Sequence, residues 1–290
     1  MSQLPVRRPA VAGRFYPGDR SGCIKLIEQC LPTEPSADLP EKLVAGLVPH
    51  AGWVFSGGVA AKVFAAFRDQ GAPETFILLS AMHGWGSSRP ALYGHGSWAT
   101  PLGEIEVDQD LAADLLAAGE GALVDAPEAH SGEHSAEVQV PFIQYLFPEA
   151  RILPILIPPD ENAPRTGEII GQTVSKAQKP VAIVGTTDLT HYGATYYGFA
   201  PAGTGEKALA WARANDERVI DLILNLQAER VVAEAAAHHN ACGGGAIAGT
   251  VAAARVMGAE KGHLLEYTPS HHVMPRGQAT DFVGYAAIVF

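Results

Sequence analysis

The sequence predicts an α/β protein whose central β-sheet is mixed, largely parallel and covered by helices. Short apolar runs alternate with stretches of helical spacing along most of the 290 residues. One run, Val181 to Thr187, is β-branched and apolar without alternation, as expected of a strand covered on both faces. The final run, VGYAAIVF, is apolar enough for sheet core. Because no repeat, low-complexity linker or break in composition occurs, we expect one domain over residues 1–290.

The individual elements follow from the same patterns. After an irregular start, Cys23 to Leu31 is expected to be a helix closed by Pro32, and Pro32 to Pro40 a polar loop. Residues Ser80 to Thr100 are expected to form a second loop. The expected strands are Leu43 to Val48, Thr75 to Leu79, Arg151 to Ile157, Val181 to Thr187, His263 to Thr268 and Phe282 to Phe290. The later helices are expected at Val59 to Phe67 (after a turn at Ser56-Gly57-Gly58), Asp108 to Ala118, Arg165 to Gln178, Glu206 to Ala237 and Ala246 to Met257.

Composition excludes several kinds of partner. The chain has 20 lysines and arginines against 31 aspartates and glutamates, a net charge of -11 that repels nucleic acid and anionic membranes. It contains no apolar run of about 18 residues, and its start lacks a continuous apolar segment. We therefore expect a cytoplasmic protein with neither nucleic acid nor membrane as partner. No glycine motif for phosphate binding follows an expected strand, so no nucleotide cofactor is expected.

Histidines stand where an α/β sheet usually binds ligands, immediately after the carboxyl ends of strands. His50 and His83 each follow an expected strand, and Asp188 and His191 follow a third. A single such histidine is adequately explained by capping a strand and bonding a loop carbonyl. Three such positions together favour a site.

Cys242 is a further candidate site residue. The chain has three cysteines and no CxxC, so no disulfide framework is expected. Cys242 directly precedes a helix, where unpaired amides are expected to lower the pKa of its thiol and make it more reactive than Cys23 and Cys30. It is then a metal ligand or a nucleophile; the alternative is a packing residue beside the glycine run Gly243 to Gly245.

The segment His130-Ser131-Gly132-Glu133-His134 matches the HxxEH pattern of inverted zinc peptidases. That chemistry needs a regular helix, which Pro127, Gly132 and Pro141 disfavour. We expect Glu133, His134 and Glu137 to line the pocket instead, bonding substrate or the metal ligands.

Five motifs together resemble those of the Memo family, in order and spacing. They are AVAGRFYP from Ala10, PHAGW from Pro49, Glu133-His134-Ser135 with Glu137, Asp188-Leu189-Thr190-His191, and Cys242-Gly243. The family is similar in fold to class III extradiol ring-cleavage dioxygenases, which hold non-haem iron at the carboxyl end of a mixed sheet. The resemblance therefore implies a dioxygenase-like fold for the whole chain.

The resemblance also implies a site. His50, His83 and Cys242 match the family's metal-site trio, and Asp188 and His191 match the pair that lines the same pocket. One difference is Ser80-Ala81-Met82 before His83, where the family usually has Gly-Pro and then Ser or Asn. The candidate substrate-binding or supporting residues are Glu133, His134, Glu137, Trp53 and Tyr192.

Two imidazoles and a thiolate favour iron or copper, with zinc also suitable, over magnesium or calcium. His191 is expected to act as acid or base, oriented by Asp188. The first functional hypothesis is a metal-dependent redox enzyme, dioxygenase-like, acting on a small molecule, with aromatic compounds among the candidates. The alternative is a non-catalytic scaffold that binds a small-molecule or peptide ligand in the retained pocket. A third hypothesis is metal-assisted hydrolysis with Glu133 or Asp188 as the base.

Overall fold

The computed structural model describes residues 5–35, 39–84 and 87–290, and parts of the two expected loops, residues 36–38 and 85–86, lie outside them. Within the described residues the main sheet has nine strands. They are β2 (Ala45–Val48), β3 (Thr75–Ser80), β4 (Ala91–Leu92), β7 (Val124–Asp125), β8 (Arg151–Leu156), β9 (Val181–Thr186), β10 (His191–Gly193), β11 (His263–Pro269) and β12 (Asp281–Val289). Their order is β10-β12-β2-β9-β3-β8-β4-β7, and β11 pairs with β12 outside this path.

The sheet is mixed, as predicted, but its parallel part is confined mainly to the centre. Strands β2, β9, β3 and β8 run parallel, with Leu47 and Leu79 both paired to Gly185 of β9 between them. Strand β12 is antiparallel to β2, β10 and β11, and β4 is antiparallel to β8. The carboxyl ends of the four central strands therefore meet at one edge, where the candidate residues follow them.

A smaller sheet covers one end of the molecule. It joins β1 (Val6–Arg7), β5 (Ser97–Thr100) and β6 (Gly103–Glu106) in the order β1-β5-β6. Strands β4 and β5 both lie in the segment from Ser80 to Thr100, so the expectation of a plain loop there was wrong. The two strands are short and pair with distant segments, which no local pattern reveals.

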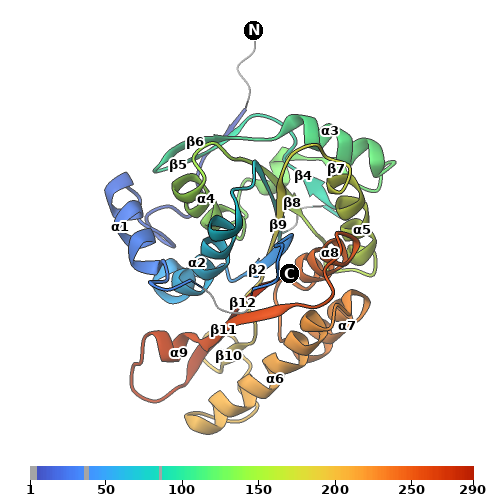
Figure 1. Cartoon of the computed structure of the whole chain (residues 1–290). Coiled ribbons are helices and arrows are strands. Elements are labelled where there is room, and N and C mark those ends of the chain that lie inside the picture. The colour runs from blue at the N-terminus through green and yellow to red at the C-terminus, as the bar shows by residue number, and fades with distance from the viewer. Residues whose placement is uncertain (1–4, 36–38, 85–86) are drawn as a thin grey trace.

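Helices cover both faces of the main sheet (Figure 1). They are α1 (Arg20–Cys30), α2 (Trp53–Gln70), α3 (Gln109–Ala118), α4 (Val140–Leu146), α5 (Ala163–Val174), α6 (Glu206–Leu224), α7 (Ala228–His238), α8 (Gly244–Val256) and α9 (Ser270–Val273), with 3₁₀ turns η1 (Pro127–His130) and η2 (Glu137–Gln139). Helix α2 packs on β2 and β12 with α1 and α4 against it, whereas α8 packs on β2, β3 and β9 with α5 and α7 against it. No helix of the described residues has the length and apolarity needed to cross a membrane.

Three local predictions were wrong. Ser56 to Gly58 lie inside α2, where a Cβ at Gly57 would come within 2.8 Å of Cys30 Sγ, so the glycine allows α1 to approach. The single helix expected from Glu206 to Ala237 divides into α6 and α7 near Leu226, whose φ is +54°. The short strand β10, which contains His191, was missed.

The glycine run before α8 has a similar role. A Cβ at Gly243 would lie 2.3 Å from the carbonyl oxygen of Thr186, and one at Gly245 would lie 2.4 Å from that of Pro158. Only glycine permits the start of α8 to approach the carboxyl ends of β8 and β9 so closely. This approach brings the preceding residue, Cys242, to the edge of the sheet where the histidines lie.

At the opposite ends of the strands, Asp108 anchors α3 to the sheet. Its buried carboxylate accepts a hydrogen bond from the Leu111 amide at 3.1 Å, as a helix N-cap, and it pairs with Thr75 and Lys179. Burial acts to raise the pKa of Asp108, but these partners outweigh it and hold the pKa below its usual value. The charged form therefore stabilises the fold above the ordinary carboxyl pKa, and that stability is lost as the pH falls through the lowered pKa.

We expect Asp108→Asn to lower the free energy of unfolding at neutral pH by about 1 to 3 kcal/mol, because asparagine keeps the cap but leaves Lys179 without its partner. Urea unfolding followed by circular dichroism measures the effect. The difference from the wild type should shrink in acid, and Asp110→Asn, on an exposed neighbour, should stay within about 0.5 kcal/mol. A difference that is constant with pH would contradict the ion-pair explanation.

Candidate metal centre and adjoining pocket

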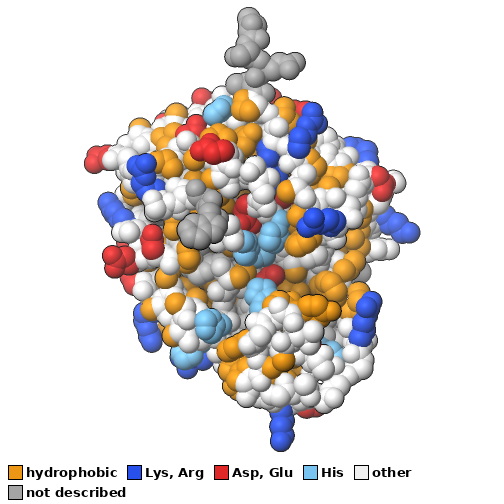
Figure 2. Space-filling view, turned by 180° about the vertical axis from the view of Figure 1, so that it is seen from behind, with side chains coloured by type: hydrophobic (Ala, Val, Ile, Leu, Met, Phe, Trp, Pro, Cys, Tyr) orange, Lys and Arg blue, Asp and Glu red, His pale blue; other side chains and the backbone are white. Residues whose placement is uncertain are grey.

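Three histidines converge at the carboxyl ends of the parallel strands. His50 follows β2, His83 follows β3, and His134 lies between η1 and η2. Each offers a ring nitrogen, and these three atoms lie within 4.8 Å of one another. Histidine side chains gather near the middle of one face in the space-filling view (Figure 2). The grouping has the spacing of ligands around a single ion.

His134 was expected only as a supporting residue, yet its ring belongs to the cluster itself. Its centroid lies 4.9 Å from that of His83, nearly stacked on it, and 5.5 Å from that of His50. The one sequence signal was its position beside Glu133. Sequence spacing could not show that the segment after η1 turns back over β3.

Cys242 also lies beside the cluster, on the side of His50. Its Sγ is 3.1 Å from His50 Nε2, and the Asp188 amide donates to the same sulfur at 3.3 Å. The structure thus brings together all three residues expected as ligands, although Cys242 is outside the group of atoms within 4.8 Å. Two trios share His50 and His83, and they differ in whether His134 or Cys242 is the third member.

The expectation of a lowered pKa for Cys242 was wrong. Burial raises the pKa of its thiol strongly, and the charge of Asp188 acts in the same direction. Helix α8 begins only at Gly244, so its first amides do not bond the sulfur directly. Burial also raises the pKa values of Cys23 and Cys30, to about 11.

Glu133 holds the cluster together. One of its oxygens accepts hydrogen bonds from the amides of His134 and Ser135, at 2.9 and 2.8 Å, and the other accepts one from the amide of His83 at 2.9 Å. His83 Nδ1 also lies 3.0 Å from the carboxylate, which leaves Nε2 of that ring free to face an ion. Burial acts to raise the pKa of Glu133, but His83 and the backbone amides hold it well below its usual range.

The pKa values of the three histidines in the cluster are shifted in different directions. Burial, reinforced by the other histidines, holds the pKa of His50 well below its usual value, and burial also lowers that of His134. Burial opposes protonation of His83 as well, but the hydrogen bond and charge of Glu133 outweigh it and raise the pKa. Neutral imidazoles are the form that binds metal.

Asp188 and His191 lie beside the cluster, but not as the hydrogen-bonded pair that was expected. His191 Nε2 is 3.9 Å from the Asp188 carboxylate, beyond hydrogen-bond distance. That carboxylate instead accepts the His50 amide at 2.8 Å. Burial raises the pKa of Asp188 to about 7, and burial lowers that of His191 to about 4.

The remaining expected residues face away from the site. Glu137 is buried and takes Arg7, the amides of Ala10 and Val11, and the Tyr16 hydroxyl as partners. Trp53 is in the core, where it packs on Tyr16 and Phe142. Tyr192 is fully buried, and its hydroxyl donates to the carbonyl of Gly203 at 2.9 Å. The structure therefore gives these three side chains places in the surrounding framework.

The HxxEH pattern does not form a paired site. His130 is buried at the end of η1, and its Nε2 lies 2.9 Å from the carbonyl oxygen of Ala91. η1 ends at His130 and His134 lies in the loop before η2, so the two histidines are not one helical turn apart.

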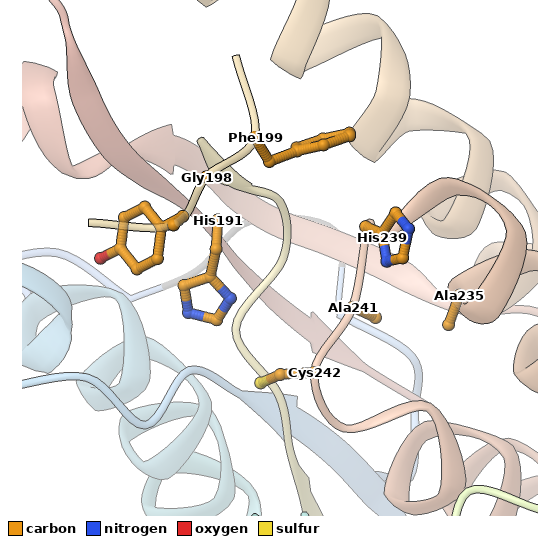
Figure 3. A pocket seen from close by; sticks show the side chains of 8 residues that line it. His191, Gly198, Phe199, Ala235, His239, Ala241 and Cys242 are labelled. Carbon is orange, nitrogen blue, oxygen red and sulfur yellow. The ribbon is translucent and has the colours of Figure 1, made fainter. Parts of the chain in front are cut away.

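A pocket adjoins the cluster, as expected, but most of its lining differs from the residues predicted for it (Figure 3). Its volume is about 540 Å³, within the range of small-molecule sites. Its lining residues are His191, Tyr197, Gly198, Phe199, Ala235, His239, Ala241 and Cys242. Of these residues, only His191 and Cys242 were predicted as site residues, because the others belong to no motif; they lie in two stretches, 197–199 and 235–241.

We expect Glu133→Gln to lower the pKa of His83 in metal-free protein, because burial then acts on the ring without the opposing carboxylate. Histidine ring signals followed by NMR across pH measure this. The same change should lower the free energy of unfolding by about 1 to 3 kcal/mol. Glu128→Gln, on the exposed neighbouring turn, serves as the control; an unchanged His83 pKa in Glu133→Gln would refute the assigned role of Glu133.

Comparisons with known proteins identify the family of the chain. A family model described as Memo-like protein matches residues 7–289. A MEMO1 family protein of Thermococcus onnurineus is 40% identical, over 98% of this chain and 99% of the relative. MEMO1 family proteins of Methanosarcina barkeri and Methanopyrus kandleri are 38% and 36% identical over 98% of this chain, and over 99% and 98% of their own lengths. The chain belongs to the Memo family.

Proposed function

We propose that this protein is a metal-dependent redox enzyme, dioxygenase-like in architecture, that acts on a small molecule. The observation that carries the proposal is the convergence of three imidazoles and a thiol at the carboxyl ends of parallel strands, next to a pocket of ligand size. Three imidazole nitrogens within 4.8 Å of one another, of which only His50 is buried, are readily explained by a shared metal ion.

The donor set fits a transition metal. His50 and His134 have lowered pKa values, so both rings are neutral and can ligate near pH 7. His50 Nδ1 is buried without a hydrogen-bond partner among the described residues, which leaves its ring orientation unexplained by bonding to protein alone. Nitrogen and sulfur donors favour iron, copper or zinc. When bound, such a metal supplies Lewis-acid or one-electron chemistry to a substrate in the pocket.

Residues of the protein itself would accept and release the proton of the substrate. His191 lines the pocket and is neutral at pH 7, because its pKa lies near 4, so it can accept a proton from a substrate hydroxyl. Asp188 positions His50 through the backbone amide of that residue. With a pKa of about 7, Asp188 can also exchange a proton near neutrality.

The two alternatives are a non-catalytic scaffold and a metal-assisted hydrolase. A non-catalytic scaffold remains the alternative, because the same pocket serves ligand capture as well as turnover. Hydrolysis with Glu133 as the base is disfavoured, because both of its oxygens are already engaged by backbone amides and His83. Of the two carboxylates considered as the base, Asp188 remains.

The first test identifies the third ligand. Cobalt(II) bound to a cysteine thiolate gives a charge-transfer band in the near ultraviolet. We expect the band in the wild type, its loss in Cys242→Ser, and its retention in His134→Gln, because only the sulfur can produce it. Both substitutions should weaken metal binding by about 10-fold or more.

Cys30→Ser, which changes a partly buried cysteine away from the site, is the matched control and should keep both band and affinity. A wild-type protein that binds cobalt without the band would remove Cys242 from the ligand set. The three histidines would then form the site alone.

The second test separates metal binding from chemistry. Protein purified without oxygen is analysed for bound elements and screened for oxygen uptake with catechols and thiols. We expect His191→Ala to keep its metal and lose turnover, because His191 is assigned to proton transfer. His272→Ala, an exposed histidine outside the site, should behave as the wild type. Loss of metal in His191→Ala would make His191 a ligand, and bound metal without turnover on any compound would favour the scaffold.

A further inference from the structure

The pocket beside the metal centre is lined mainly by rings. Half of its eight lining residues carry one, namely His191, Tyr197, Phe199 and His239. The centroids of His191 and Tyr197 lie 5.1 Å apart, and those of Phe199 and His239 lie 5.4 Å apart in an edge-to-face arrangement. Figure 3 shows Phe199 above the open space and His239 to its right, with Cys242 below. Such walls offer stacking and edge contacts to a flat ligand.

The rest of the lining leaves room between those rings. Gly198, Ala235 and Ala241 carry no side chain larger than a methyl group, so they add little bulk to the lining. Phe199 is also packed against Trp211, at a centroid distance of 5.5 Å, which fixes its orientation from behind. The cavity is therefore held open by packing outside it.

The pocket carries no charged side chain among its described lining residues. It contains neither lysine nor arginine, and neither aspartate nor glutamate. His191 is neutral at pH 7, since burial lowers its pKa to about 4. A carboxylate or phosphate entering the pocket would lose water without gaining a partner. The lining thus favours an uncharged occupant.

His239 gives an independent indication that the pocket binds a ligand. It ends α7 in the left-handed region, with φ of +51° and ψ of +36°. Glycine or asparagine is the usual residue there, because a Cβ costs free energy in that conformation. The histidine at this position faces Phe199 and lines the pocket. Residues kept in unfavourable backbone conformations are concentrated at functional sites.

We propose that this pocket binds an uncharged, planar aromatic ring, and that Phe199, His239 and Tyr197 determine this specificity. The inference rests on the proposed function, whose substrate class it names. The ring lies between Phe199 and His239 on one side and Tyr197 on the other. A hydroxyl on the ring points inward, toward His191 and Cys242.

Binding of three small probes tests the proposal. They are 4-methylphenol, its saturated counterpart 4-methylcyclohexanol, and the charged 4-hydroxybenzoate, each titrated by NMR into zinc-loaded and metal-free protein. Zinc prevents redox turnover during the titration. We expect 4-methylphenol to bind about 5-fold more tightly than the saturated alcohol, as edge and stacking contacts require. In metal-free protein the benzoate should bind more weakly than 4-methylphenol, because the lining side chains offer its charge no partner.

Three variants test whether this pocket causes the preference. His239→Gly removes the ring and relieves the left-handed backbone, so it should weaken 4-methylphenol by about 5-fold while the Tm stays equal or rises. Tyr197→Ala should weaken the probe similarly, whereas Tyr196→Ala should not, since Tyr196 is 80% exposed and does not line the pocket. A loss of affinity in His239→Gly without a loss of Tm would exclude misfolding as the cause.

Equal binding of 4-methylphenol and 4-methylcyclohexanol would overturn the proposal, as would tighter binding of the benzoate or unchanged affinity in His239→Gly. Different results would refute the proposed function. A protein that holds no metal, or shows no turnover, can still prefer 4-methylphenol, and one that turns over a substrate without that preference refutes only the specificity assigned here.

Discussion

The buried carboxylate of Glu133 is the constraint on which the candidate site depends. It accepts the amides of His83, His134 and Ser135 and orients the His83 ring, so two histidines from different segments are fixed by one group. A buried charge with so many partners is costly to disturb, because the amides would be left unsatisfied. The same charge sets the protonation of His83, and through it the repulsion felt by His50.

The segment that carries Glu133 is itself held by the start of the chain. Arg7 donates to the carbonyl oxygens of His130 and Glu133, at 2.9 and 2.6 Å, and pairs with Glu137 at 2.8 Å. Its guanidinium also lies 4.1 Å from the centre of a Trp98 ring. This buried ion pair is hydrogen-bonded on both sides, the condition under which burial of charge is tolerated. Arg7 therefore supports the segment that carries Glu133.

One part of the site is buried, and another part is exposed to solvent. His50 and Glu133 lie among packed strands and buried turns, whereas Tyr197 and His239 are exposed at the mouth of the pocket. A preorganised cluster with an open, ring-lined entrance suits an enzyme that must keep its ligands fixed while exchanging a small substrate. Burial lowers the pKa values of His50, His134 and His191, which favours the neutral imidazoles that bind metal.

The sequence by itself determined the α/β class, most of the strands and the family, because hydrophobic periodicity and motif order are local properties of the chain. It also placed His50, His83, Asp188 and Cys242 at strand ends and a helix start, where a parallel sheet gathers them. Tertiary structure alone decided that His134 joins the cluster, that Glu137 bonds the N-terminal segment, and that burial raises the pKa of Cys242. These outcomes depend on contacts between residues more than 50 positions apart and on the water that packing excludes, and neither is encoded in local spacing.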